Sequence, residues 1–596
     1  MRNMLDIEKL RKLKGLSILC IGSYPNIIQS ILDYDFLSGK KTPSVVGIIA
    51  SGRQNERYFF GKGEVMIPVF PSFESIPQKL REEVTAFFNN SSGRRVYSST
   101  AKALDSLPGL LLGVIFAEET PEKHAIELFR KAREKEVTII GPASVGLLLP
   151  GIGKIGAIGG VDGRQLTSAH VMTPGNVAVF SSSGGMSNEL INLVTSSGHR
   201  ISFALSFGGD RFPITTPLDA LLAAQKDKQT DYIVYFGELG GYDEYEFADA
   251  IKSKKITKPV ICYIAGSVSD MFATPPQFGH AKAMAGRSGE GALAKRKALK
   301  DVGALVADSF TEFVRIVRSL PKKEYKETEY AMIEKEMTDR QHALIATTVS
   351  GDRDGKVMVL GEELLPFAKG NSFAKIVGSL FLGKKLRSRD TENFIDFVLR
   401  LLVDHGPYVS GAVNTIITAR AGKDMVSSLA AGLLTIGPRF GGAINDSAEN
   451  WLQGATKGVS PAEFVENFAA KRQYIAGIGH KKYRIDVPDP RVKELLRYAV
   501  GKKHFTQFAL SVEKITTAKK GNLILNVDGT IAAVLLDLLY EKEGYSVEEL
   551  QKLVDSEFFN GLFVLSRSVG FISHFLDQKR LDEGLFRLPE EDVAQV

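Results

Sequence analysis

Residues 177–194 read VAVFSSSGGMSNELINLV, an apolar run that passes through a serine- and glycine-rich turn directly into an amphipathic segment. A short β-branched strand followed at once by a helix is typical of the βα units of parallel sheets. The free backbone N–H groups at the start of such a helix can bind an anion, and glycines allow the anion to approach closely. An ordinary strand-to-helix turn capped by serine has the same pattern, so this motif alone leaves both readings open.

The same alternation extends in both directions from this stretch. Further strand-like runs lie at residues 17–22, 44–50, 65–70, 110–117, 137–144, 201–207, 231–239, 259–267 and 303–309. We therefore expect two Rossmann- or flavodoxin-like parallel-sheet domains, residues 1–150 and 151–320, with the glycine-rich stretch 151–163 at their boundary.

The character of the chain changes after residue 320. Residues 321–340 are dense in charge and predict an exposed connector or bridging helix. Beyond them, helical patterns dominate, as in residues 393–406, 529–544 and 560–580. The fold class is thus predicted to be α/β followed by an all-α domain over residues 341–596.

Composition narrows the classes of function. The 596 residues carry 75 Lys and Arg against 69 Asp and Glu, a net charge of +6 spread along the chain, which favours anionic small molecules over nucleic acid. Cys20 and Cys262 lie in apolar runs and predict buried, reduced thiols. The amino end is charged where a signal peptide is apolar, and the apolar run at 110–117 is too short to span a bilayer. We expect a cytoplasmic protein with no membrane contact.

Two residues of the α/β half are candidates for chemistry. His280 lies in a loop rich in Gly, Ala and Ser, although a single loop histidine is usually a surface residue. Glu238 ends a predicted strand and so lies at the carboxyl edge of the sheet, where open α/β folds bind ligands. Its carboxylate would orient the imidazole or bind Mg²⁺, unless it is only a solvated acid at the end of a strand.

Three polar positions interrupt the helical half, and each lies close to glycine: His405, His480 and Asp528. An Asp before Gly at a helix start is most often an N-cap, but the three together would form an acid/base set around a carbon acid. Arg491 and Arg567 stand among apolar neighbours, where a di- or tricarboxylate would be a suitable partner. For Arg567 a structural salt bridge is the alternative.

Two blocks of motifs carry a family resemblance. SSSGGMSNE, SFGGDRFP, GELGG and FGHAKA resemble, in order and spacing, the α-subunit of succinyl-CoA synthetase and its relatives. DHGPYVSGAVNTIITARAGKDMVSSL and NLILNVDG resemble the citrate-synthase fold in the form found at the carboxyl end of ATP-citrate lyases. Together they cover essentially the whole chain and indicate the large subunit of the ATP-citrate lyase family.

This resemblance implies a role for each part of the α/β half. Residues 1–150 would bind CoA, and residues 151–320 would carry His280 as a phosphorylated carrier between a nucleotide site and a substrate site. Glu238 would be its acidic partner or a metal ligand, and Gly184, Gly185 and Ser187 would surround the phosphate. ATP, CoA and citrate are the implied substrates, with Mg²⁺ as the metal.

The resemblance also implies a retro-aldol cleavage of citryl-CoA in the domain formed by residues 341–596. His480 would act at the citryl hydroxyl, taking or sharing its proton, and Asp528 would protonate the departing enolate carbon. The remaining implied roles are carboxylate binding and contact with CoA phosphates: His405, Arg491, Arg567 and Lys481 for the former, Lys519 and Lys520 for the latter. A solvated basic turn is the alternative for the two last lysines.

Three departures from the family pattern stand out. Ser182 and Lys481 occupy positions where the family has arginine, and Phe440 and Gly441 replace a further histidine of citrate synthases. The last departure favours a lyase over a plain synthase.

The resemblance further implies partners. A subunit with an ATP-grasp domain, resembling the β-subunit of succinyl-CoA synthetase, would supply the nucleotide site, for which this chain leaves no residues. The citrate-synthase-like domain would self-associate into a tetrameric core. Two alternatives stay open: a similar fusion acting on another dicarboxylate, and a non-catalytic CoA-binding assembly subunit.

Overall fold

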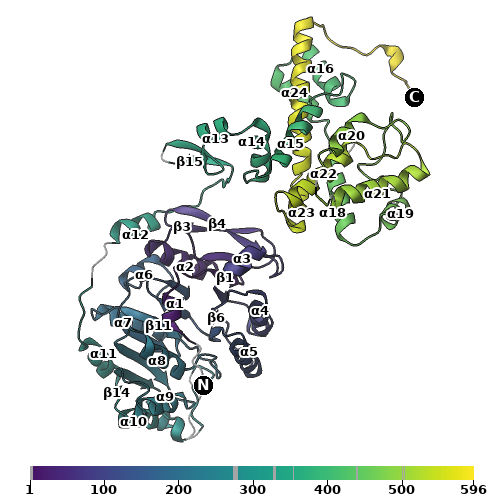
Figure 1. The fold of residues 1–596 in the computed structure, drawn as a ribbon. Helices are drawn as coiled ribbons and strands as arrows, with labels where there is room; N and C mark the ends of the chain where they lie inside the picture. Colours follow the sequence, from purple (N-terminus) through teal and green to yellow (C-terminus); the bar gives the residue numbers. More distant parts are fainter. Residues whose placement is uncertain are drawn as a thin grey trace. The chain divides into compact units, whose positions relative to one another are not determined.

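The computed structural model describes residues 5–272, 279–286, 288–325, 330–353, 355–437, 440–499, 501–502 and 504–596. The chain divides into two compact units, unit 1 (Met1–Leu344) and unit 2 (Ile345–Val596) (Figure 1). Among the helices formed by these residues, none combines the length and the apolar character needed to cross a membrane.

The first half of unit 1 is built on a twisted sheet with the strand order β3-β4-β2-β1-β5-β6-β7. Its strands are β1 (Ile18–Ile21), β2 (Val45–Ile49), β3 (Asn55–Phe60), β4 (Gly63–Phe70), β5 (Ala86–Asn89), β6 (Leu112–Ile115) and β7 (Thr138–Ile140). The helices of this half are α1 (Ile7–Arg11), α2 (Pro25–Leu37), α3 (Gln78–Glu83), α4 (Gly93–Ser106) and α5 (Glu122–Glu134). Strands β1, β5 and β6 are buried along their whole length, which explains their near-continuous apolar sequences.

The second half of unit 1 repeats this design with the strand order β14-β13-β12-β10-β11-β8-β9. Its strands are β8 (Gly146–Leu149), β9 (Gly153–Gly156), β10 (Val177–Ser181), β11 (Ile201–Ser206), β12 (Tyr232–Glu238), β13 (Val260–Ala265) and β14 (Leu305–Val306). The helical segments are α6 (Gly163–Ser168), α7 (Gly184–Ser196), α8 (Pro217–Lys226), α9 (Asp243–Lys252), η1 (Ser267–Met271), η2 (Ser288–Glu290), α10 (Ala292–Asp301) and α11 (Phe310–Arg318).

Both sheets are mixed at one edge, whereas the sequence pattern predicts parallel sheets. β3 pairs antiparallel with β4 in the first sheet, and β8 pairs antiparallel with β9 and β11 in the second. The glycine-rich stretch 151–163, expected between the domains, instead supplies β9 of the second sheet. Gly146 and Gly156 make this hairpin possible, because a Cβ on either would meet backbone atoms of the other strand.

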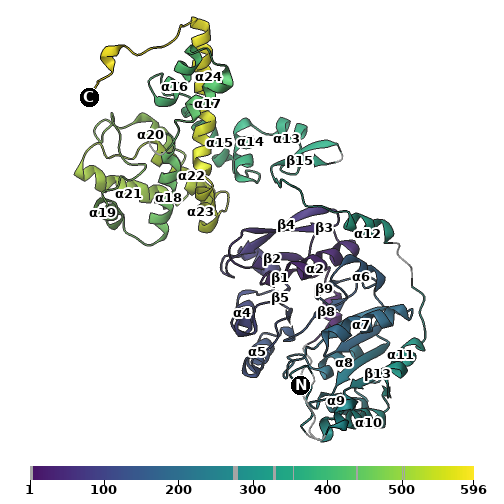
Figure 2. The same ribbon diagram turned by 180° about the vertical axis from the view of Figure 1, so that it is seen from behind.

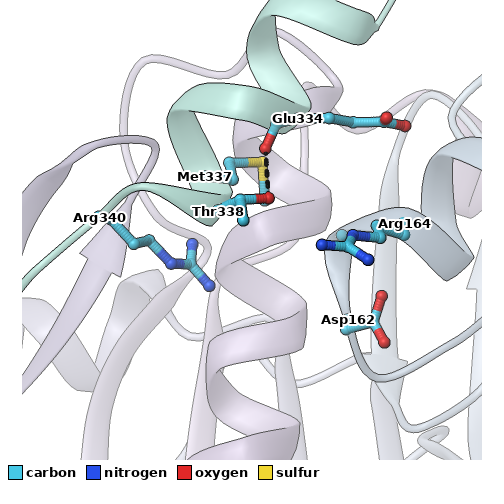
Figure 3. Close-up of a pocket in the computed structure, with 7 residues that line it drawn as sticks. Asp162, Arg164, Glu334, Met337, Thr338 and Arg340 are labelled. Atoms are coloured by element: carbon cyan, nitrogen blue, oxygen red, sulfur yellow. Dashed lines mark hydrogen bonds between the residues drawn. The ribbon is translucent and has the colours of Figure 1, made fainter.

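The connector after residue 320 is docked on unit 1. Its helix α12 (Ala331–Thr338) lies beside α6, and Figure 3 shows Glu334, Met337 and Thr338 on one side of a pocket with Asp162 and Arg164 on the other.

The residues that follow α12 stay on unit 1. The guanidinium of Arg340 donates to both carboxylate oxygens of Asp33 on α2, at 2.8 and 3.0 Å. At least one charged residue of this segment thus makes a specific ion pair with unit 1, while other charged side chains are exposed to solvent.

Within the described residues, unit 2 is helical apart from one small sheet. Its helices are α13 (Leu364–Gly370), α14 (Phe373–Leu382), α15 (Arg389–Leu401), α16 (Ser410–Arg420), α17 (Met425–Leu433), α18 (Ala443–Thr456), α19 (Pro461–Ala470), α20 (Pro490–Leu496), α21 (His504–Lys519), α22 (Val527–Glu541), α23 (Val547–Asp555), α24 (Phe558–Leu581) and η3 (Glu590–Asp592). In both views α24, drawn in yellow, runs the length of this unit (Figures 1 and 2).

The core of unit 2 lies around α22, whose residues from Thr530 to Leu539 are all buried. The expectation of an all-α domain is corrected at its start, where β15 (Ser350–Arg353), β16 (Lys356–Val359) and β17 (Glu362–Glu363) form an antiparallel sheet. These strands are short and mostly exposed, so they lack the apolar alternation by which a strand is recognised in sequence.

Candidate functional site

The first candidate site lies at the point where the order of the second sheet reverses. β10 pairs with β11 on one side and with β12 on the other, and in open α/β sheets ligands bind beyond the carboxyl ends of the strands at such a point. β10 leads into the turn before α7, and β12 ends at Glu238. The topology therefore brings the turn of residues 182–185 and Glu238 to one crevice.

The start of α7 faces open space. Gly184 is the first residue of the helix, and the side chain of the N-cap Ser183 accepts from the Met186 N–H at 3.4 Å. A Cβ added at Gly185 would meet nothing within 4 Å. The backbone of this turn can therefore approach a phosphate, although the arginine of the family pattern is replaced by the buried Ser182.

His280 is held at this crevice by Glu238. Its Nδ1 lies 2.8 Å from Oε2 and 3.1 Å from Oε1 of that carboxylate. The hydrogen bond raises the pKa of His280 against the lowering effect of burial, and Glu118 and Asp210 add to the rise. Because Nδ1 is held by this carboxylate, Nε2 is the ring nitrogen that acts as the nucleophile when the ring is neutral.

A cavity of about 490 Å³ joins these groups. It is lined by Phe116, Glu118, Glu119, Ala143, Val145, Ser182, Ser183, Gly184, Gly185, Gly209, Asp210, Gly279, His280 and Ala281. Ser187, the third expected phosphate ligand, is not among them: its side chain is buried and its hydroxyl donates to the Ser183 carbonyl at 2.9 Å. Phe278 of the FGHAKA motif lies outside the described residues.

A metal site is not formed by the described residues. Within the ranges that the structure describes, no group of three or more His, Cys, Asp or Glu side chains could hold a metal ion. Both carboxylate oxygens of Glu238 lie within hydrogen-bond distance of His280. The geometry fits Glu238 as the partner of the imidazole better than as a metal ligand.

The second candidate site is a cavity of about 220 Å³ in unit 2. Five of the residues predicted for carbon–carbon chemistry and carboxylate binding share it with apolar neighbours. Its lining is Leu402, His405, Phe440, Gly441, His480, Arg491, Asn526, Val527, Asp528, Phe563 and Arg567. Residues separated by more than 160 positions in the sequence thus surround one space.

Asp528 lies in the first turn of α22 but does not cap it. The N-cap is Asn526, whose side-chain oxygen accepts from the Gly529 N–H at 3.0 Å. Burial raises the pKa of Asp528 to about 6, and the charges of Arg491 and Arg567 oppose this rise. The carboxyl group is therefore available as an acid near neutral pH.

His480 is fixed in one tautomer by the backbone. Its Nδ1 accepts from the N–H groups of Lys482 and Tyr483, both at 3.0 Å. The neutral ring therefore carries its hydrogen on Nε2 and donates through that atom. Burial lowers the pKa of His480, which keeps the ring neutral.

Asp489 is a residue of this site that the sequence patterns did not reveal. It is buried, and its Oδ2 accepts from Arg491 Nη2 at 2.7 Å while Oδ1 accepts from Nε at 3.0 Å. The same carboxylate caps α20 through the Arg491 N–H. The sequence Asp-Pro-Arg, with Pro490 at the start of α20, was the available signal, because Asp before Pro is a common helix start.

Arg567 is a charged residue of this cavity whose N–H groups are not all satisfied within the described residues. It is buried, and its Nε and Nη1 have no hydrogen-bond partner in the part of the chain that the structure describes. Its guanidinium lies over the ring of Phe563, 4.8 Å from the centroid. A salt bridge at Arg567, the alternative raised by the sequence, is not found among these residues.

Burial together with Arg491 and Arg567 also lowers the pKa of His405.

The remaining predicted residues lie elsewhere. Lys481, Lys519 and Lys520 are exposed and do not line the cavity. Phe440 and Gly441, which replace the further histidine of citrate synthases, do line it, and Phe440 packs edge-on against Phe563. Residues 438–439 beside them lie outside the described ranges.

Comparisons with known proteins match the segments that carry His280 and the cavity of unit 2. The family model described as citrate synthase, C-terminal domain, matches residues 314–588, and the model described as CoA-ligase matches residues 180–305. The ATP-citrate synthase subunit 1 of Sordaria macrospora is 38% identical over 594 residues, which cover 96% of this chain and 88% of that protein. The human ATP-citrate synthase is 38% identical over 598 residues, covering 96% of this chain and 54% of its own length.

A solved structure matches as well. The ATP citrate lyase of Methanothrix soehngenii, in complex with citrate and coenzyme A, is 35% identical, with a TM-score of 0.51 over 98% of this chain and 97% of that one. On these comparisons, and on the two cavities that carry the predicted groups, the chain belongs to the ATP-citrate lyase (ATP-citrate synthase) family.

Proposed function

We propose that this chain is the large subunit of an ATP-citrate lyase, which converts ATP, citrate and CoA into ADP, phosphate, oxaloacetate and acetyl-CoA. The observation that carries this proposal is the gathering of His405, His480, Arg491, Asp528 and Arg567 around one cavity. A variant of a Methanosaeta concilii relative, 35% identical to this chain, has been solved with (3S)-citryl-CoA, the intermediate that such a cavity would cleave.

The first stage takes place at His280. Its Nε2 attacks the γ-phosphorus of ATP and ADP leaves; the phosphoryl group then passes to a citrate carboxylate, and the CoA sulfur displaces phosphate to give citryl-CoA. Gly184 and Gly185 at the start of α7 hold the phosphoryl group, and Glu238 holds Nδ1. Mg²⁺ would accompany the nucleotide and neutralise phosphate charge.

The second stage takes place in unit 2. Arg567 and Arg491 bind carboxylates of citryl-CoA, with His405 as a neutral donor beside them. His480 donates from Nε2 to the oxygen on the carbon that becomes the ketone of oxaloacetate, rather than taking the proton of the hydroxyl. The hydroxyl proton passes to water as the carbon–carbon bond breaks, the bonding electrons form the enolate of acetyl-CoA, and the enolate carbon takes the proton of Asp528.

The partner that we propose is a subunit with an ATP-grasp domain. The relative from Sordaria macrospora is itself named as one subunit of its enzyme. The second half of unit 1 has exposed apolar side chains that would offer a docking surface: Val268, Met271 and Phe272 after β13, and Met284 four residues after His280. We also propose that the helical domain self-associates into a tetrameric core, in which the exposed apolar side chains Val426 and Leu434 of unit 2 would be buried. The two buried free thiols suit a cytoplasmic enzyme.

Two variants of the full chain, each co-expressed with this partner, test the division of labour. His280→Ala should abolish citrate-dependent ATP consumption but still cleave supplied citryl-CoA, whereas Asp528→Ala should consume ATP and accumulate citryl-CoA. The products are followed by liquid chromatography of CoA thioesters. Synthesis of citryl-CoA by the His280 variant, or normal oxaloacetate release by the Asp528 variant, would overturn the corresponding assignment.

A further inference from the structure

A buried lysine lies directly beneath the turn that carries Glu238. Lys295, on α10, is 0% exposed. Its Nζ donates to the backbone carbonyl of Glu238 at 2.9 Å and to that of Gly240 at 2.6 Å, and lies 2.6 Å from Oε2 of Glu244. The charge is therefore shared between one carboxylate and two carbonyls of a single turn.

Burying this ion pair costs free energy, because both charged groups lose their contact with water. Glu244 is also buried, at 3% exposed, and its other oxygen accepts from the Tyr235 hydroxyl at 2.8 Å. Removing two charges from water carries a desolvation penalty that their attraction often fails to offset, so apolar side chains of similar volume are commonly as stable or more so. Stability is therefore a weak explanation for this ion pair, whereas its contacts show that Lys295 holds two carbonyl groups of the turn after β12.

What it holds is the backbone that positions Glu238. The carboxylate of Glu238 contacts Nδ1 of His280 at 2.8 Å, and its own carbonyl is held by Lys295. The N–H of Gly240, where φ is +92°, donates to the Glu290 carbonyl at 2.8 Å. The turn after β12 is thus tied to α10 and to the residues that precede it.

We propose that Lys295 is a positioning residue for phosphoryl transfer through His280. By fixing the carbonyls of Glu238 and Gly240 it keeps the Glu238 carboxylate on Nδ1, and so leaves Nε2 as the nucleophile. This inference rests on the proposed role of His280 as phosphate carrier. Lys295 lies behind the strand end and does not line the cavity, so its effect on the reaction passes through Glu238.

The test replaces Lys295 with a neutral side chain of similar length. Lys295→Met, and the double variant Lys295→Met with Glu244→Gln, which removes both buried charges, are compared with Lys297→Met on the exposed face of the same helix. Each full chain is co-purified with its ATP-grasp partner, and the rate of acid-labile, alkali-stable ³²P incorporation from ATP is measured between pH 5.5 and 8.5.

The expected result has two parts. Glu238 raises the pKa of His280, and phosphorylation needs the neutral ring, so the wild-type rate rises with pH through that pKa. When Glu238 is free to move, the rising limb shifts to lower pH and the plateau falls by about tenfold or more, because the ring is no longer oriented. A purely structural role would reduce the yield of folded protein without shifting the limb.

The outcomes separate the two hypotheses. Wild-type protein that forms no phosphohistidine would refute the proposed function itself. A wild type that is phosphorylated, with Lys295→Met or the double variant matching it in plateau and limb, would overturn the role of Lys295 alone. The Lys297 control should match the wild type throughout.

Discussion

Asp528 yields a prediction in which activity and stability move in opposite directions. Its pKa is raised from 3.8 to about 6 by burial. At about 1.36 kcal/mol per pKa unit, ionising this carboxyl in the folded protein costs up to ~3 kcal/mol relative to the unfolded chain. The folded state binds the proton more tightly than the unfolded chain does. The protonated carboxyl therefore stabilises the fold in full below about pH 4, and this stabilisation is lost as pH rises to about 6. Asp528→Asn removes the loss.

We therefore expect Asp528→Asn to be more stable than the wild type at pH 7.5, by up to ~3 kcal/mol, and to lose this advantage as pH falls toward 4. Trp451 is a suitable probe, because it is the single tryptophan of the chain and its indole N–H donates to the Gly529 carbonyl at 3.0 Å. Urea unfolding of the ligand-free chain, followed by tryptophan fluorescence, measures the stability of unit 2.

The same variant should fail to cleave supplied citryl-CoA, because the amide has no proton to give to the enolate carbon. Asp555→Asn, an exposed position on α23, is the matched control and should leave both properties unchanged. Two results would show that burial does not set the pKa of this carboxyl. One is an Asp528→Asn protein that is less stable than the wild type at pH 7.5, and the other is a wild-type stability that does not fall between pH 4 and 6.

Two further substitutions test the carboxylate-binding groups. Arg567→Met removes two N–H groups that await an acceptor, each worth ~1.5–3 kcal/mol to a charged ligand, so calorimetric titration should show oxaloacetate binding at least about 100-fold more weakly. The ligand-free protein should be no less stable; an affinity within a few-fold of wild type, or of the exposed Arg580→Met control, would contradict this role. Asp489→Asn loosens Arg491, and we expect KM for citryl-CoA to rise about tenfold with a smaller change in kcat, whereas Asp486→Asn should change neither. A fall in kcat at constant KM would show that Asp489 acts otherwise.

The positions of the candidate groups could be predicted from sequence only where local chemistry marks them. Glu238 and the turn at Gly184 follow from a strand end and a strand-to-helix junction, because strand ends share one edge. His280 lies in a loop, and its role was indicated by the family resemblance. Ser187 could not be excluded in this way, because a helical residue one turn past the cap faces either the site or the core, and the structure buries it.

Two residues that the sequence did not reveal, Lys295 and Asp489, were missed for the same physical reason. Lys295 and Asp489 act through backbone carbonyls and a neighbouring guanidinium, contacts that leave no pattern in the chain. The state of Arg567 was equally undecided, because its neighbours in sequence do not show whether an acceptor from another helix reaches it.

The sequence by itself determined the buried parallel strands with their following helices, the change from α/β to helical structure and the two sets of candidate side chains, because these depend on periodicity and on residues close together in the chain. Only the tertiary structure decided the antiparallel edges of the sheets, the docking of α12, the tautomer of His480 and the acidity of Asp528. Each of these depends on burial or on a partner distant in sequence, and desolvation and hydrogen-bond geometry act between such groups only after the chain has folded.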